Sequence, residues 1–177
     1  MGYYIEITDS FFRIPKANID KFWERATLLM TDEVIEENGS GGSWESGKKT
    51  DFWYAWVDTD KARRAILNRD IKDFFAQWGY EVVLGDNDSQ YEVVDLYHST
   101  RSSYKVGNEE ALFAAIAPTV EDGSFLHIRG EEGGEWRWAF YKGNLHAQDV
   151  IDKVYHFSNC DEYNQVGFGK KNFDVFR

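Results

Sequence analysis

The sequence predicts an α+β fold, in which an antiparallel sheet of hairpins packs with several short helices in a single domain, residues 1–177. Three observations support this prediction. The chain has 177 residues, which suits one domain of ordinary size and leaves too few for a second. Stretches with strand composition are joined by short turns, as in hairpins. Stretches with helical periodicity lie between them, and no Gly-rich loop joins a strand to a helix as in a doubly wound nucleotide fold.

The N-terminal segment is expected to form a hairpin followed by two helices. Residues 3–7 are rich in strand formers, residues 8–10 are turn formers, and residues 11–14 could return as the second strand. Residues 18–30 carry apolar side chains at the i, i+3, i+4 spacing of an amphipathic helix, and a short acidic helix over 32–37 follows.

The middle of the chain alternates between loops, helices and strands. A Gly/Ser-rich stretch predicts a flexible loop at about 39–50, and the aromatic run 52–57 predicts a strand buried on both faces. Asp58 is expected to cap a helix that runs to about residue 67. Asp70 is expected to cap a second helix, which Gly79 ends.

Two hairpins and one more helix are predicted after that. Strands at 80–84 and 91–97 flank a Gly- and Asp-rich turn, and a helix is expected from 108 to 117. Strands at 124–129 and 135–141 form the second hairpin, with Trp136, Trp138 and Phe140 on one face, toward the helices. We expect a third strand from Leu145 to about Gln148. Residues 149–157 could be helix or strand, and the tail 158–177 is expected to be irregular.

Charge and composition restrict the classes of function. Asp and Glu number 31 against 20 Lys and Arg, for a net charge of -11, and basic residues occur only in short groups. Direct nucleic-acid binding is therefore disfavoured, whereas attraction to a basic protein surface is reasonable. With no apolar stretch of membrane-spanning length, no signal-peptide pattern and a single Cys160, we expect a cytoplasmic protein without disulfides or membrane contact.

Aromatic residues make up 17% of the chain. We expect most of these rings to build the core, since each buries a large apolar area, and a few to remain for a surface.

The search for catalytic, metal and cofactor motifs predicts none. The glycine clusters lack the lysine and the strand-to-helix context of a P-loop. His127 and His146 could lie on neighbouring strands with His98 nearby, but hydrogen-bonded or exposed strand histidines are the simpler interpretation. His156 and Cys160 are close in sequence, which does not supply the geometry of a nucleophile and its base.

Several motifs carry a resemblance to a known group of proteins. They are Ile116-Ala117-Pro118-x-Val120-Glu121-Asp122-Gly123-Ser124-Phe125-Leu126, then Arg129-Gly130-Glu131-x-Gly133 and Trp136-Arg137-Trp138-x-Phe140, with Tyr3-Tyr4-Ile5-Glu6-Ile7 and Trp56-Val57-Asp58 nearer the start. Together they cover about half of the chain, which resembles a group of small uncharacterised bacteriophage and prophage proteins. The resemblance implies a genomic source and no catalytic residue. The Gly/Ser loop and the aromatic tail depart from it.

These observations lead us to expect an acidic protein-binding module, specifically a phage-encoded inhibitor of a host nucleic-acid-binding defence protein of the anti-CRISPR or anti-restriction type. Its surface carboxylates would occupy a basic groove in the cytoplasm of the bacterial host. A structural or accessory phage protein, and a small enzyme whose site no motif reveals, are the alternatives.

A candidate partner-binding segment follows from the clustering of acids beside the flexible loop and its tryptophan. On a short helix, glutamates at i, i+3 and i+4 share one face, and charge beside an aromatic suits capture of a basic partner. A solvated helix face is the alternative. The candidate residues are Asp32, Glu33, Glu36, Glu37, Trp44 and Glu45.

Overall fold

The computed structural model describes residues 5–38, 54, 57–98, 109–151 and 154–158. Within these ranges the fold is α+β, as predicted, with five α-helices, two short 3-10 helices and two antiparallel sheets. The larger sheet has the strand order β1-β5-β6-β7-β8, and the smaller has the order β2-β4-β3.

The elements follow the chain in a simple order. The helices are α1 (Ile19–Leu29), α2 (Asp32–Asn38), α3 (Thr59–Asn68), α4 (Ile71–Gln77) and α5 (Glu109–Ile116), with 3-10 turns η1 (Lys16–Asn18) and η2 (Ala117–Thr119). The strands are β1 (Ile5–Phe11), β2 (Ile14–Pro15), β3 (Tyr80–Leu84), β4 (Tyr91–His98), β5 (Phe125–Gly130), β6 (Glu135–Tyr141), β7 (Asn144–Ile151) and β8 (Val154–Ser158).

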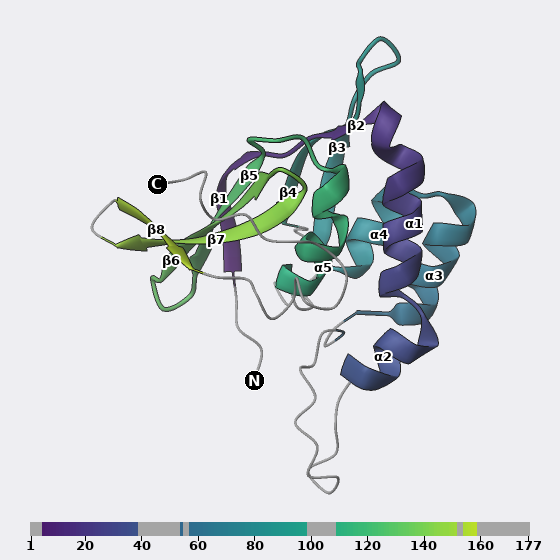
Figure 1. Cartoon of the computed structure of the whole chain (residues 1–177), viewed down its shortest axis with the longest axis horizontal. Coiled ribbons are helices and arrows are strands. Elements are labelled where there is room, and N and C mark those ends of the chain that lie inside the picture. Colours follow the sequence, from purple (N-terminus) through teal and green to yellow (C-terminus); the bar gives the residue numbers. More distant parts are fainter. Residues whose placement is uncertain (1–4, 39–53, 55–56, 99–108, 152–153, 159–177) are drawn as a thin grey trace, which may run out of the picture.

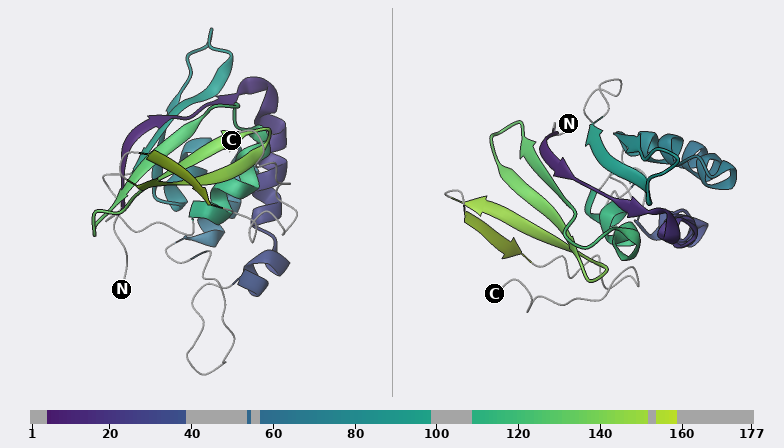
Figure 2. Two further views of the ribbon diagram at one scale, coloured as in Figure 1. Left: turned by 60° about the vertical axis from the view of Figure 1, so that its left-hand side comes forward. Right: turned by 90° about the horizontal axis from the view of Figure 1, so that it is seen from above.

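The elements form layers (Figure 1). The five-stranded sheet lies on one side and α1, α3 and α4 on the other, with α5 between them in contact with both α1 and β7. The view from above in Figure 2 shows the same separation, and β3 packs beside α4. The position of α5 explains its composition, because Ala111–Ile116 is buried on every side.

The helices begin and end where their sequence signals place them. Asp58 caps α3 by accepting a hydrogen bond from the Lys61 amide, and Asp70 caps α4 through the Asp73 amide, both at 3.0 Å. Gly79 follows α4 with φ of 89°, a conformation that glycine adopts without steric cost.

The first strand differs from its prediction. Residues 8–10 do not turn; β1 continues to Phe11 and pairs with β5, with an irregularity between Ile7 and Asp9. β2 then pairs with β4 in the other sheet. The turn propensity of Asp9 and Ser10 is overridden because both pair with β5, and Ser10 also donates a hydrogen bond to Asp95 on β4 at 2.7 Å.

The strand predicted at 52–57 is not found at either of its two described positions. Tyr54 lies in a turn, with its carbonyl accepting a hydrogen bond from the Val57 amide at 3.0 Å, and Val57 has no regular structure. The aromatic ring of Tyr54 packs among helices instead, which satisfies its apolar character without strand pairing. The flexible loop predicted at 39–50 and most of the tail lie outside the described residues.

The C-terminal half matches its prediction closely. β5 and β6 form the expected hairpin, and residues 149–157, left open between helix and strand, belong largely to β7 and β8. Trp138 and Phe140 are buried on the face predicted, and Trp136 packs against the core from its edge.

Aromatic rings form most of the core, as the composition predicts. Phe12 lies at its centre, with edge-to-face contacts to Phe75 and Phe140 at ring-centroid distances of 6.3 and 5.3 Å. The largest fully buried rings are Trp78, Tyr54, Tyr80, Phe12, Phe22, Phe74, Phe75, Phe113 and Phe140.

Candidate functional site

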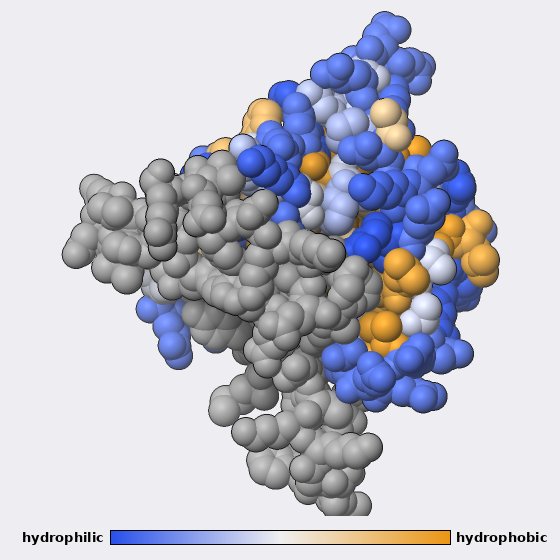
Figure 3. Space-filling view, viewed as in Figure 1, coloured by the Kyte–Doolittle hydropathy of each residue, from blue (hydrophilic) through white to orange (hydrophobic). Residues whose placement is uncertain are grey.

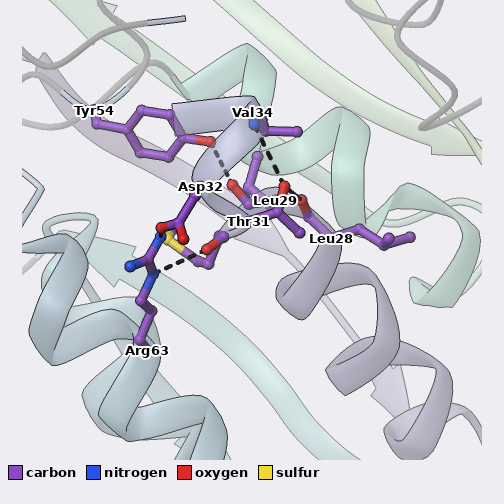
Figure 4. Close-up of polar contacts among 8 residues, drawn as sticks. Leu28, Leu29, Thr31, Asp32, Val34, Tyr54 and Arg63 are labelled. Atoms are coloured by element: carbon purple, nitrogen blue, oxygen red, sulfur yellow. Dashed lines mark hydrogen bonds and ion pairs between the residues drawn. The ribbon is translucent and has the colours of Figure 1, made fainter. Parts of the chain in front are cut away.

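The predicted acidic segment forms helix α2, which begins immediately after α1. Thr31 makes the connection: its hydroxyl donates to the Leu28 carbonyl at 3.2 Å and accepts from the Val34 amide at 3.4 Å. The Ile35 amide donates to the Thr31 carbonyl at 3.1 Å. The direction of α2 is therefore set by the end of α1 (Figure 4).

Arg63 of α3 holds this junction from the other side (Figure 4). Its Nε donates to the Met30 carbonyl at 2.9 Å, and its Nη2 pairs with the Asp32 carboxylate. Because the side chains of Arg63 and Asp32 are 37% and 82% exposed, the ion pair itself adds little stability. Asp32, the first of the predicted partner residues, therefore already forms an ion pair within the chain.

Tyr54 supports the same junction from the interior. Its hydroxyl donates to the Leu29 carbonyl, and its ring lies 5.8 Å from that of Trp78. Burial raises the pKa of Tyr54 well above its usual range, so the hydroxyl stays protonated and remains a donor. The start of α2 is thus fixed by a buried contact as well as a surface one.

The outward face of α2 carries the remaining glutamates. Glu33, Glu36 and Glu37 are exposed, whereas Val34 and Ile35 are half-buried against the core. The surface around α2 in Figure 3 is hydrophilic and borders hydrophobic patches. Three carboxylates at i, i+3 and i+4 therefore project from one side of a helix whose other side is anchored. Trp44 and Glu45, also predicted here, lie outside the described residues.

A second acidic residue of interest, Glu109, lies deep inside the molecule. It begins α5 and is only 9% exposed. The Trp138 indole donates to its Oε2 at 2.8 Å, and the Tyr80 hydroxyl interacts with the same carboxylate. Residues from α5, β6 and β3 therefore converge on one carboxyl group.

Burial controls the protonation of Glu109. Desolvation raises its pKa to about 7, and the charge of Glu110 adds to the rise, while the contacts with Trp138 and Tyr80 oppose it. Glu109 therefore titrates near neutral pH, well above the range of an exposed glutamate.

His98 adjoins this cluster. Its ring stacks on Tyr80 with centroids 5.1 Å apart, and its Nδ1 accepts a hydrogen bond from the Ile7 amide at 2.9 Å. Burial lowers the pKa of His98 to about 4, so the ring is neutral and able to accept that bond at neutral pH. The neutral imidazole links β4 of the small sheet to β1 of the large one.

The other candidate histidines do not come together. His127 is on β5 and His146 on β7, with β6 between them, and His127 lies 3.4 Å from Glu135. Among the described residues, no group of three or more His, Cys, Asp or Glu side chains is arranged to hold a metal ion.

Sequence reasoning assigned Glu109 only to the start of a helix and missed its burial. One signal was available: the stretch 111–117 is apolar on every side of a helix, which indicates a central helix rather than a surface one. An acidic residue at the start of a central helix is buried together with the helix.

In the described part of the chain, the helices are too short or too polar to cross a lipid bilayer. Comparisons with protein-family models, with curated proteins and with solved structures found no match to this chain.

Proposed function

We propose that this chain is an acidic protein-binding module that occupies the basic surface of a nucleic-acid-binding protein. The more specific form of the proposal is a phage-encoded inhibitor of a host defence nuclease, of the anti-CRISPR or anti-restriction type. The source rests on the resemblance of the hairpin motifs, and the binding mode rests on charge.

The observation that carries the proposal is the anchored acidic face of α2. Glu33, Glu36 and Glu37 are exposed on a helix whose start is held by Arg63 and Tyr54. The helix that carries the three carboxylates is therefore held in place before a partner binds, so binding orders the glutamate side chains but not the backbone. A basic groove built for phosphates offers the complementary charge, and a net charge of -11 steers the encounter.

The proposal is tested by nuclease inhibition. A panel of purified CRISPR effectors and restriction endonucleases would cleave a DNA substrate with and without the chain, at low and high ionic strength. We expect inhibition of at least one enzyme, with an association rate that falls as salt rises because exposed charges are screened. If the chain forms no complex with any basic nuclease, or inhibits equally at both ionic strengths, the proposal is wrong.

Two triple variants locate the contact. Glu33→Gln, Glu36→Gln and Glu37→Gln together should slow association by about tenfold and flatten its salt dependence. The matched control is Glu24→Gln, Glu131→Gln and Glu132→Gln, which removes the same charge from exposed positions elsewhere. An equal decrease of the association rate in the two variants would show that association depends on the net charge of the chain and not on the face of α2.

A further inference from the structure

The hairpin of β3 and β4 extends beyond the body of the molecule. In Figure 1 and in the left view of Figure 2, its turn is the part that projects farthest at one end, while α2 lies at the other. In the described sheet, β3 is an edge strand, with β4 its only neighbour. A projecting edge hairpin is accessible to a partner from several directions.

The turn of this hairpin holds one conformation. A Cβ added to Gly85 would lie 2.1 Å from the Tyr91 carbonyl oxygen, so only glycine fits there. The Asp86 carboxylate accepts from the Ser89 amide at 2.8 Å, and Lys16 Nζ donates to the carbonyls of Asp86 and Asn87 at 3.0 and 3.2 Å. Its shape is therefore preset, as in the junction at α2.

The hairpin is strongly acidic. Residues 80–98 contain no Lys or Arg. Its five acids are Glu81, Asp86, Asp88, Glu92 and Asp95. Lys16 Nζ binds backbone carbonyls of the turn, so its single positive charge offsets part of the local charge while the five acids keep the hairpin acidic.

Apolar side chains lie exposed among these acids. Val83 is 42% exposed, Leu84 37% and Tyr97 42%. Val83 and Tyr97 lie on the face opposite that of the buried Val82 and Leu96, whereas Leu84 pairs with the buried Val93 and shares the core-facing side at the end of β3. Val83 and Tyr97 are therefore not needed to hold the hairpin on the body, and exposed apolar groups on a projecting hairpin are a hazard unless a partner covers them.

The strand register arranges the two kinds of side chain in an alternating pattern. Val83 lies opposite Asp95, and Glu81 lies opposite Tyr97. Paired residues share a face, so this face presents acid and apolar groups alternately along and across the strands. The complementary surface carries cations and apolar groups in the same alternation.

We infer that the β3–β4 hairpin is a docking surface for a basic segment of a protein partner, one in which cationic and apolar side chains alternate. Charge complementarity selects the cations, and Val83 and Tyr97 receive the apolar side chains. The inference rests on the proposed function, since it adds a second point of contact to the acidic face of α2. The two points lie at opposite ends of α1, which spans about 16 Å.

The probe is a fluorescein-labelled synthetic peptide of alternating Arg and Leu, with a peptide of alternating Glu and Leu as its charge-reversed control. Fluorescence anisotropy at physiological ionic strength gives the affinity, and amide NMR shifts locate the contact. We expect the basic peptide to bind with shifts concentrated in residues 80–98, and the acidic peptide not to bind.

Two hairpin variants separate the apolar and charged contributions. Val83→Thr with Tyr97→Thr places β-branched side chains at both strand positions of the exposed face and should weaken peptide binding by about tenfold at any salt concentration. Asp86→Asn, Asp88→Asn and Glu92→Gln should weaken it mainly at low salt. The Asp86→Asn change retains a side-chain oxygen that can accept from the Ser89 amide, so this variant preserves the turn and keeps the test decisive if the first variant fails to fold.

The Glu33, Glu36 and Glu37 variant serves as the control for position. It should leave peptide affinity unchanged, because salt screens the charges of α2 over the distance to the hairpin. If that variant abolishes peptide binding while the hairpin variants do not, the inference is overturned and the proposed function stands. Absence of binding to the basic peptide also overturns the inference, whereas the nuclease assay alone decides the proposed function.

Discussion

Glu109 and Glu33 have the same local setting and opposite environments. Both stand in the first turn of a helix, where the positive end of the helix dipole favours a carboxylate. Glu109 is 9% exposed and is contacted by Trp138, whereas Glu33 is exposed on the surface of α2. The same signal therefore produces a buried proton-binding group in one helix and a surface charge in the other.

The difference comes from what each helix packs against. α5 lies between α1 and β7, and six consecutive residues from Ala111 to Ile116 are buried. α2 contributes only the half-buried Val34 and Ile35 and has no fully buried residue. Burial of the helix as a whole, and not its first turn, determines whether its acid is enclosed in the fold or exposed at the surface.

The largest effect expected at the buried site is the loss of Trp138. Replacing Trp138 with Ala removes a side chain that is 8% exposed and takes away the hydrogen bond to Glu109. The free energy of unfolding should fall by about 3–5 kcal/mol, as for other buried large rings, measured by urea denaturation. A loss below about 1 kcal/mol would mean that this face is exposed, and Trp136 and Trp138 would then become candidates for a partner surface.

The next effect concerns the pH dependence of Glu109. Its pKa is raised from 4.5 to about 7 in the folded state, so between these pH values the unfolded chain loses the proton and the folded chain keeps it. Below pH 4.5 both states are protonated and stability is unaffected. As pH rises through this window the fold loses about 3 kcal/mol.

Glu109→Gln removes that titration. The stability of the variant relative to the unmodified chain should rise by about 3 kcal/mol between pH 4.5 and 7, followed by urea denaturation across the range. A constant difference over this range would show that Glu109 is ionised in the folded state.

His98 should make stability depend on pH in the opposite direction, so that stability is lost as pH falls. Its pKa is lowered from 6.5 to about 4, so the unfolded chain takes up a proton in this window before the folded chain does. Stability is therefore lost as pH falls from 6.5, by about 3 kcal/mol at pH 4.

The test is His98→Asn, whose side-chain oxygen can accept from the Ile7 amide without titrating. The variant should hold its stability below pH 6.5 where the unmodified chain weakens, measured by thermal unfolding. If the variant and the unmodified chain lost stability equally in acid, His98 would not be the group responsible for the loss.

The contrast between the two glutamates also shows which features of the structure could be predicted from the sequence. The α+β class, the caps at Asp58 and Asp70, and both hairpins followed from local patterns, because turn chemistry and capping depend on near neighbours. The continuation of β1 to Phe11 did not, since pairing with β5 joins residues more than a hundred positions apart.

At the candidate site, the outward glutamates of α2 followed from i, i+3, i+4 spacing, whereas the anchors did not. Arg63 and Tyr54 reach the junction from distant parts of the chain. The convergence of Tyr80 and Trp138 on Glu109 is likewise long-range and has no local signal.

The smallest expected effect is on the stability of α2 itself. Glu33 gains from the positive end of the helix dipole, while Glu36 and Glu37 lie toward the negative end and repel Glu33 at i+3 and i+4. These terms are each a few tenths of a kcal/mol and oppose one another, so replacing all three by Gln should change the free energy of unfolding by less than about 0.5 kcal/mol. Urea denaturation measures this directly, and the Glu24, Glu131 and Glu132 variant provides the reference for net charge. Because Arg63 and Tyr54 hold the junction without these glutamates, a loss above about 1 kcal/mol would mean that the three carboxylates stabilise the fold, and would remove them from the proposed partner surface.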